Sequence, residues 1–211
     1  MTKRRYFLRF FLSSIVAALS LSSRAGAQTE SPEAVVRSAA EQVLESIDGR
    51  REELKANPAE LRELVNTAFL PRFDRSYAAY LVLGRYGRAA SADQRSRFTE
   101  ALYEYMLSRY ANGLLSYTSD RLEILPYQGT PGEERASVRT FVRLNDGRRI
   151  PVNYDLRLGN EGWRVFDISI EGISYVRNLR SQLGEEIDQN GLESVISRLL
   201  AESAPSEDGS A

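Results

Sequence analysis

Residues 163–182 combine acids, hydroxyls and arginines densely enough to suggest an active site. Asp167 and Glu171 could in principle act as a general acid and a general base. The run reads as a strand, on which side chains four positions apart share a face and lie roughly 13 Å apart. A glycosidase pair needs about 5–9.5 Å between its carboxyl groups. We therefore expect a structural role for both acids, with Gly172 forming a turn and Ser174 capping the next helix.

Other catalytic chemistry is limited by composition, because the 211 residues include no histidine and no cysteine. This excludes a Ser-His-Asp triad, a cysteine nucleophile, disulfides and metal sites built on His or Cys. An enzyme acting on a hydrophobic small molecule could still use an aspartate base and a tyrosine donor. Tyr154 and Asp155 are adjacent, however, so they face opposite sides of a strand and cannot form one site from it.

The first 27 residues have the order of a secretory signal peptide. A basic segment precedes the apolar run FFLSSIVAALSL, and the small residues AGA at positions 25–27 provide a cleavage site. The apolar run is shorter than the roughly 20 residues that span a bilayer. The motif RRYFLR resembles a twin-arginine signal, so Sec and twin-arginine export both stay open.

Charge argues against a nucleic-acid partner. Residues 1–27 hold five of the 28 basic residues and none of the 29 acidic ones, which leaves 23 bases against 29 acids after cleavage. The remaining bases are scattered along the chain. A mildly acidic protein without a basic cluster lacks the counterion release that drives binding to phosphate backbones.

Hydrophobic periodicity changes from helical to alternating near Gly113, which predicts one α+β domain over residues 28–200. We expect a curved antiparallel sheet of about four strands, covered by helices on one face. Capping signals at Ser31, Asn57 and Ser91 mark predicted helix starts. The predicted parts are helices over 32–113, a sheet over 119–171 with strands at 119–126, 135–144, 148–158 and 162–171, C-terminal helices at 175–189 and 192–200, and a disordered tail over 201–211.

Alternation predicts which residues share the apolar face of this sheet. An ordinary core is one interpretation of this face, and a surface that lines a ligand pocket is the other. Ile173 lies between the turn and the helix cap, so it either borders such a pocket or packs the helix onto the sheet. The predicted apolar face comprises Val138, Thr140, Val142, Leu144, Ile150, Val152, Tyr154, Leu156, Leu158, Phe166, Ile168 and Ile170.

The run WRVFDISIEGISYVRNLRSQL resembles the signature of the MlaC family, the periplasmic phospholipid-binding proteins also called toluene-tolerance auxiliary transport proteins. A second block, YLVLGRYGRAASADQRSRFTEAL, resembles the family through Leu83-Gly84, Gln94-Arg95 and Phe98. Tyr86-Gly87 replaces an aromatic-arginine pair, and Leu183 stands where phenylalanine is common. The matching residues of the first block are Trp163, Val165, Asp167, Glu171, Gly172, Ser174, Arg180 and Gln182.

The resemblance implies an NTF2-like fold and a soluble periplasmic carrier without catalytic residues, metal or cofactor, whose cargo is phospholipid. It implies transport between an outer-membrane lipoprotein complex and an inner-membrane ABC transporter with an MCE-domain subunit, maintaining outer-membrane lipid asymmetry. An NTF2-like enzyme and a ligand-free periplasmic adaptor are the alternatives. The residues expected to contact lipid are Val138, Val142, Val152, Tyr154, Leu156, Phe166, Ile168, Ile170 and Ile173 around the sheet, together with Tyr105 from the long helix.

Overall fold

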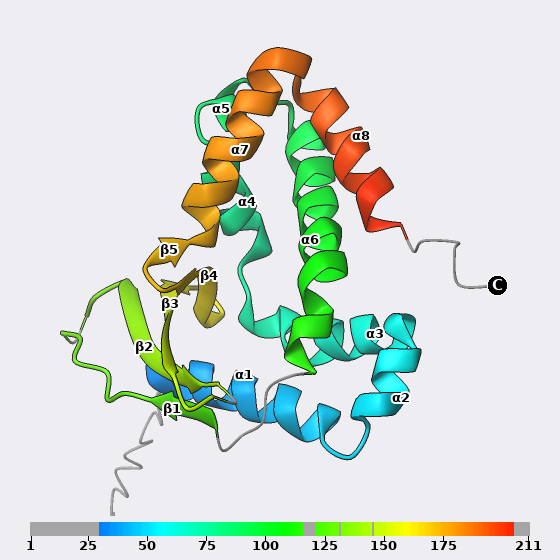
Figure 1. Cartoon of the computed structure of the whole chain (residues 1–211). Helices are drawn as coiled ribbons and strands as arrows, with labels where there is room; N and C mark the ends of the chain where they lie inside the picture. The colour runs from blue at the N-terminus through cyan, green and yellow to red at the C-terminus, as the bar shows by residue number, and fades with distance from the viewer. Residues whose placement is uncertain (1–29, 116–120, 131, 145, 205–211) are drawn as a thin grey trace, which may run out of the picture.

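Helices form the N-terminal half of the protein and a meander of strands follows them, as a computed structural model shows (Figure 1). The structure describes residues 30–115, 121–130, 132–144 and 146–204. The predicted signal peptide, part of the first predicted strand and residues 205–211 of the predicted tail lie outside these ranges. The helices are α1 (Pro32–Ile47), α2 (Arg51–Ala56), α3 (Pro58–Ala68), the 3-10 helix η1 (Leu70–Arg72), α4 (Arg75–Leu83), α5 (Tyr86–Ala89), α6 (Ala92–Leu114), α7 (Tyr175–Asn190) and α8 (Leu192–Ser203).

The predicted helix starts are confirmed by their caps. The Ser31 hydroxyl accepts a hydrogen bond from the Ala34 amide at 3.1 Å. At the start of α6, Ser91 and Gln94 exchange side-chain and backbone hydrogen bonds at 2.9 and 3.1 Å, which completes a capping box. These contacts satisfy amides that a helix start leaves unpaired. Helix α8 continues through Ser203, so the first residues of the predicted tail are helical.

In the part of the chain that the structure describes, the sheet has five antiparallel strands in the order β1-β2-β3-β4-β5, where about four were predicted. The added strand, β5, is short and follows β4 through a tight turn. None of the helices in the described ranges is long and apolar enough to cross a bilayer. The strands are β1 (Leu122–Ile124), β2 (Arg135–Arg143), β3 (Arg149–Gly159), β4 (Gly162–Ile170) and β5 (Ile173–Ser174).

A β-bulge in β4 changes which of its residues face which side. Asp167 pairs with Asp155, but the next pair along β3 joins Leu156 to Val165, so Phe166 is the extra residue. Directly opposed residues share a face, and Val165 therefore takes the place on the apolar face that alternation assigned to Phe166. The prediction for Phe166 was wrong because a bulge interrupts the two-residue period.

Buried apolar side chains of the described residues fall into three clusters. The sheet cluster joins Val138, Leu156 and Val165 to Val35 and Val36 of α1. A helical cluster lies among α4, α6, α7 and α8, and a third joins the C-terminal half of α1 to α2, α3 and α6. In Figure 1, α1 lies against one side of the sheet and the four helices of the second cluster stand together beyond its β5 end.

The turn between β4 and β5 places two consecutive residues at positive φ, Glu171 at 51° and Gly172 at 82°. Ile170 and Ile173 pair directly across it. Two positive φ values in a two-residue hairpin loop define a type I′ turn, whose twist matches that of the strands. Glycine adopts such a conformation readily, whereas a side chain meets its own backbone there.

Gly172→Ala should lower the free energy of unfolding by about 1–2 kcal/mol, because alanine is strained at this φ. No atom lies within 4 Å of the added Cβ, so the loss would come from the backbone alone. Gly113→Ala is the matched control, since its Cβ also meets open space but lies in a helix, where alanine adds up to about 1 kcal/mol. Urea denaturation measures both, and an equal effect of the two substitutions would contradict the assigned turn.

Candidate functional site

The apolar face of the sheet is built from side chains that lie directly opposite one another on neighbouring strands. Each set crosses the strands as a row, and α1 covers the row that contains Val165. The rows are Ala136-Leu156-Val165, Val138-Tyr154-Ile168, and Ile124-Thr140-Val152-Ile170-Ile173.

Coverage of this face decreases along β4 toward β5. Val165 is 1% exposed, Ile168 and Ile170 are half-buried, and Ile173 is 62% exposed. Tyr154, opposite Ile168, is also half-buried. Along β4 the apolar face thus passes from a dry core at Val165 to an accessible surface at Ile173, while Thr140 and Val152, in the same row as Ile173, stay buried.

The sequence prediction of an apolar sheet face therefore covers two environments. Val138 and Leu156 are fully buried against α1, as an ordinary core requires, and Val142 and Val152 are also buried. Tyr154, Ile168, Ile170 and Ile173 form the accessible part, toward β4 and β5. The alternative that Ile173 packs α7 onto the sheet is wrong, because most of its surface is exposed.

Two predicted contact residues lie apart from this end of the sheet. The Phe166 ring packs edge-on against Tyr77 of α4, with centroids 5.1 Å apart. Tyr105 borders the helical cluster, where the guanidinium groups of Arg109 and Arg198 lie 5.4 and 5.9 Å from its ring centroid. The structure does not bring either ring together with the accessible apolar rows.

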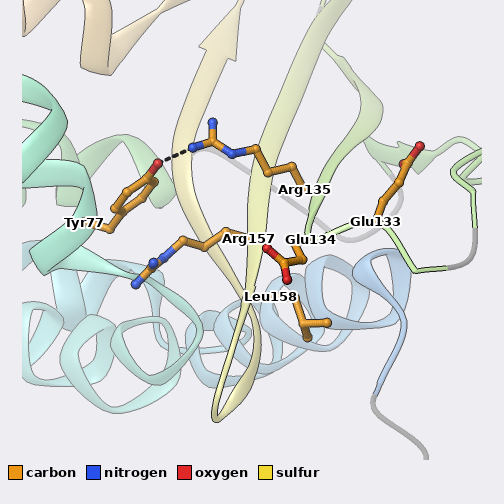
Figure 2. A pocket seen from close by; sticks show the side chains of 6 residues that line it. All are labelled: Tyr77, Glu133, Glu134, Arg135, Arg157 and Leu158. Carbon is orange, nitrogen blue, oxygen red and sulfur yellow. Dashed lines mark hydrogen bonds between the residues drawn. The ribbon is translucent and has the colours of Figure 1, made fainter.

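A polar pocket of about 430 Å³ lies where β2 begins and β3 ends (Figure 2). Arg135 donates a hydrogen bond to the Tyr77 hydroxyl, and the Arg157 guanidinium lies 4.2 Å from the centre of the Tyr77 ring. Arg157 also donates to Asp74 at 2.6 Å. With Glu133 and Glu134 at its rim, this charged lining is unsuited to acyl chains.

Asp167 is 7% exposed, and both of its carboxylate oxygens are occupied. One accepts from the Ser174 hydroxyl and the other from the Val176 amide at 3.0 Å. Ser174 in turn caps α7 by accepting from the Arg177 amide at 3.0 Å. The predicted cap is confirmed, and the contacts give Asp167 a structural role.

The structure pairs Asp167 with Asp155, which lies directly opposite on β3, rather than with Glu171. Sequence reasoning missed this pair because it requires the strand register. It also missed Phe73, which bridges to Val165 at the edge of β4, and the edge-on contact between Tyr110 and Tyr175 at 5.4 Å. No group of three or more acidic side chains in the described ranges is arranged to hold a metal ion.

Comparison with known proteins gives consistent matches. A family model described as MlaC protein matches residues 37–201. The intermembrane phospholipid transport system binding protein MlaC of Haemophilus influenzae is 24% identical over 193 residues, covering 90% of each chain. The toluene tolerance protein ttg2D of Pseudomonas putida is 30% identical over 186 residues, covering 87% of this chain and 84% of the relative.

A solved structure shares the fold. It is described as a phospholipid-binding protein from Ralstonia solanacearum in complex with a phospholipid. It superposes with a TM-score of 0.75 at 22% identity, covering 81% of this chain and 96% of the other. The α+β class expected from the sequence is confirmed by this likeness and by the observed sheet.

Asp167→Ala should lower the free energy of unfolding by about 1–3 kcal/mol, because it leaves a buried hydroxyl and a helix amide without their acceptor. Asp155→Ala is the matched control on the neighbouring strand, since Asp155 is half-buried and lies opposite. Thermal and urea unfolding of both variants give the comparison. An equal loss of unfolding free energy in the two variants would contradict the structural role assigned to Asp167 at the start of α7.

Proposed function

The chain belongs to the MlaC family, and on that basis we propose that it is a periplasmic phospholipid carrier that moves lipid between the inner and outer membranes. The observation that supports this proposal most directly is the apolar sheet face whose coverage ends toward β5. The exposed fraction rises from 1% at Val165 to 62% at Ile173 along this face. Acyl chains would cover the side chains that the protein itself leaves accessible.

The energetics of such a carrier require a membrane as the alternative environment. Two acyl chains bring about 30 methylenes, whose removal from water is worth roughly 24 kcal/mol. This exceeds the practical limit of about 18–21 kcal/mol for non-covalent affinity. A bilayer offers the chains nearly the same gain, so transfer between membrane and carrier has a small net free energy and partners can set its direction.

The proposed partners are an outer-membrane lipoprotein complex and an inner-membrane ABC transporter with an MCE-domain subunit. Family membership supports them, together with the N-terminal sequence expected to direct export. The names of the relatives from Haemophilus influenzae and Pseudomonas putida refer to phospholipid transport and to toluene tolerance. Maintenance of outer-membrane lipid asymmetry is the biological role that follows from lipid transport between these two partners.

Two other functions make different predictions for the purified protein. An enzyme would convert a hydrophobic substrate, and a ligand-free adaptor would contain no lipid. A carrier purified without detergent should contain phospholipid in near-stoichiometric amount. Lipid extraction followed by mass spectrometry therefore distinguishes a carrier from both alternatives.

Ile168→Trp should reduce the extracted phospholipid several-fold, because a larger ring would fill the accessible part of the apolar face. Asn153→Trp is the control, since Asn153 lies on the neighbouring strand and faces the opposite side of the sheet. The measurement is phospholipid per protein in variants that keep the wild-type circular dichroism spectrum. Full occupancy in Ile168→Trp, or an equal loss in Asn153→Trp, would assign the lipid elsewhere.

Ile173→Glu should leave the melting temperature of delipidated protein nearly unchanged, because the side chain is already 62% exposed. It should lower lipid content, since a carboxylate at the open end of the apolar row is costly beside acyl chains. Ile170→Glu, its half-buried partner across the turn, should lower both quantities. A large fall in melting temperature with lipid retained would rule out a position at the pocket entrance.

A further inference from the structure

The second face of the sheet carries arginines, and on β2 it is open to solvent. Its β2 positions Arg135, Arg139 and Arg143 are exposed. Arginines also lie directly opposite one another, as the pairs Arg143-Arg149, Arg135-Arg157 and Arg157-Arg164 show. On the paired residues of the described strands, the acids of this face are Glu123, Asp155 and Asp167.

Like charges placed directly opposite destabilise a sheet, so each pair needs a counter-charge. At the end where β3 finishes, the protein supplies them: Arg157 pairs with Asp74, and Arg164 pairs with Glu161. At the other end, by the β2–β3 hairpin, Glu123 pairs with Arg149. Arg139, further along β2, has no ion pair within the described ranges.

This hairpin end is hollowed into a pocket of about 320 Å³. The Arg149 guanidinium lies 4.3 Å from the centre of the Phe141 ring and also donates to Glu123, while about half of the Arg149 side chain (51%) stays exposed. Basic side chains outnumber acidic ones around the pocket. Its lining comprises Arg121, Glu123, Phe141, Arg143, Gly147 and Arg149.

The hairpin arginines and the open end of the apolar face lie at the same end of the sheet. Arg149 begins β3, and Ile173 joins the apolar row through Val152 and Ile170, near the start of β3 and the end of β4. The Glu171 amide donates to the Pro151 carbonyl at 3.0 Å, which holds the β4–β5 turn beside the start of β3. A surface that meets this end therefore meets both features.

We propose that Arg121, Arg143 and Arg149, at the hairpin end of the sheet, together with Arg139 further along β2 on the same face, dock the protein onto an anionic bilayer by binding lipid phosphates. Guanidinium groups match phosphate oxygens bidentately. Lipid phosphates diffuse laterally and can adopt the spacing of fixed arginines, whereas the carboxylates of an acidic protein partner would have to be placed in advance. The proposal deepens the proposed function, because docking would bring the open apolar end to the lipid source.

The protein is purified in the form that the producing cell accumulates. The test is whether it floats with two kinds of lipid vesicle. One kind is phosphatidylcholine alone and the other contains phosphatidylglycerol. We expect binding only to the second kind, falling as salt is raised. Each basic residue near an anionic surface strengthens binding about fivefold, so the double variant Arg139→Gln/Arg143→Gln should bind about 25-fold more weakly.

Lys55→Gln/Arg88→Gln is the matched control, because it removes the same charge from exposed side chains of α2 and α5. It should change vesicle binding less than about twofold. An equal loss in the two double variants, or equal binding to both kinds of vesicle, would overturn the proposal. A third outcome would also overturn it: the wild type binds glycerophosphoglycerol or a polyglutamate peptide tightly, and Arg139→Gln/Arg143→Gln loses that binding while its binding to vesicles is unchanged.

Cargo is measured separately by lipid extraction. Arg139→Gln/Arg143→Gln should retain the phospholipid content of the wild type, because both side chains lie on the face opposite the apolar rows. If the wild type contains no lipid but floats with anionic vesicles, the docking surface stands and the carrier function fails. If lipid is present and flotation is absent, the docking surface alone is wrong.

Discussion

The hydrogen bonds of Asp167 join the sheet to the helices that follow it. A buried carboxylate on β4 accepts from Ser174 and from the Val176 amide, at the start of α7. An acid at this position also interacts favourably with the positive end of the helix dipole. Because α7 contacts α4 and β4 and leads into α8, this joint, together with the direct contact of α4 with β4, sets the position of the helical cluster relative to the sheet.

Local features of this fold could be predicted from the sequence, since they depend on neighbouring residues. The capping box at Ser91 and Gln94 and the strand ends near Arg135 and Gly162 follow from side chains within a few positions. The position of Phe166 could not be predicted in this way. A bulge is defined by the register with β3, and the alternation of residues along β4 alone does not indicate it.

Only part of the candidate site could be predicted, because the sequence pattern shows local features and not the contacts between distant segments. Alternation identified Tyr154, Ile168 and Ile170 as members of one apolar face, which the register confirms. It could not show that α1 covers Val138 and Leu156 and leaves the β5 end accessible, because α1 is distant in sequence. Tyr105 of the long helix was expected to contact lipid together with the sheet residues, whereas it borders the helical cluster against α8.

The two faces of the sheet separate two kinds of interaction. Apolar rows on one face suit acyl chains, and arginines on the other suit anionic groups. The strands hold both sets at fixed spacing, because successive side chains point to opposite sides. A bulge at Phe166 keeps Val165 in the core while turning the Phe166 ring toward Tyr77, so one extra residue lets β4 supply a large apolar group to each face.

The division of the core into three clusters determines what spectroscopic probes of this protein report. Trp163 is the single tryptophan of the chain, and it borders the sheet cluster with α1. Its fluorescence therefore reports the environment of that cluster. Far-UV circular dichroism is dominated instead by the helices, most of which belong to the other two clusters. Coincident transitions by the two signals would show that the clusters unfold as one cooperative unit, as a joint at Asp167 between sheet and helices requires.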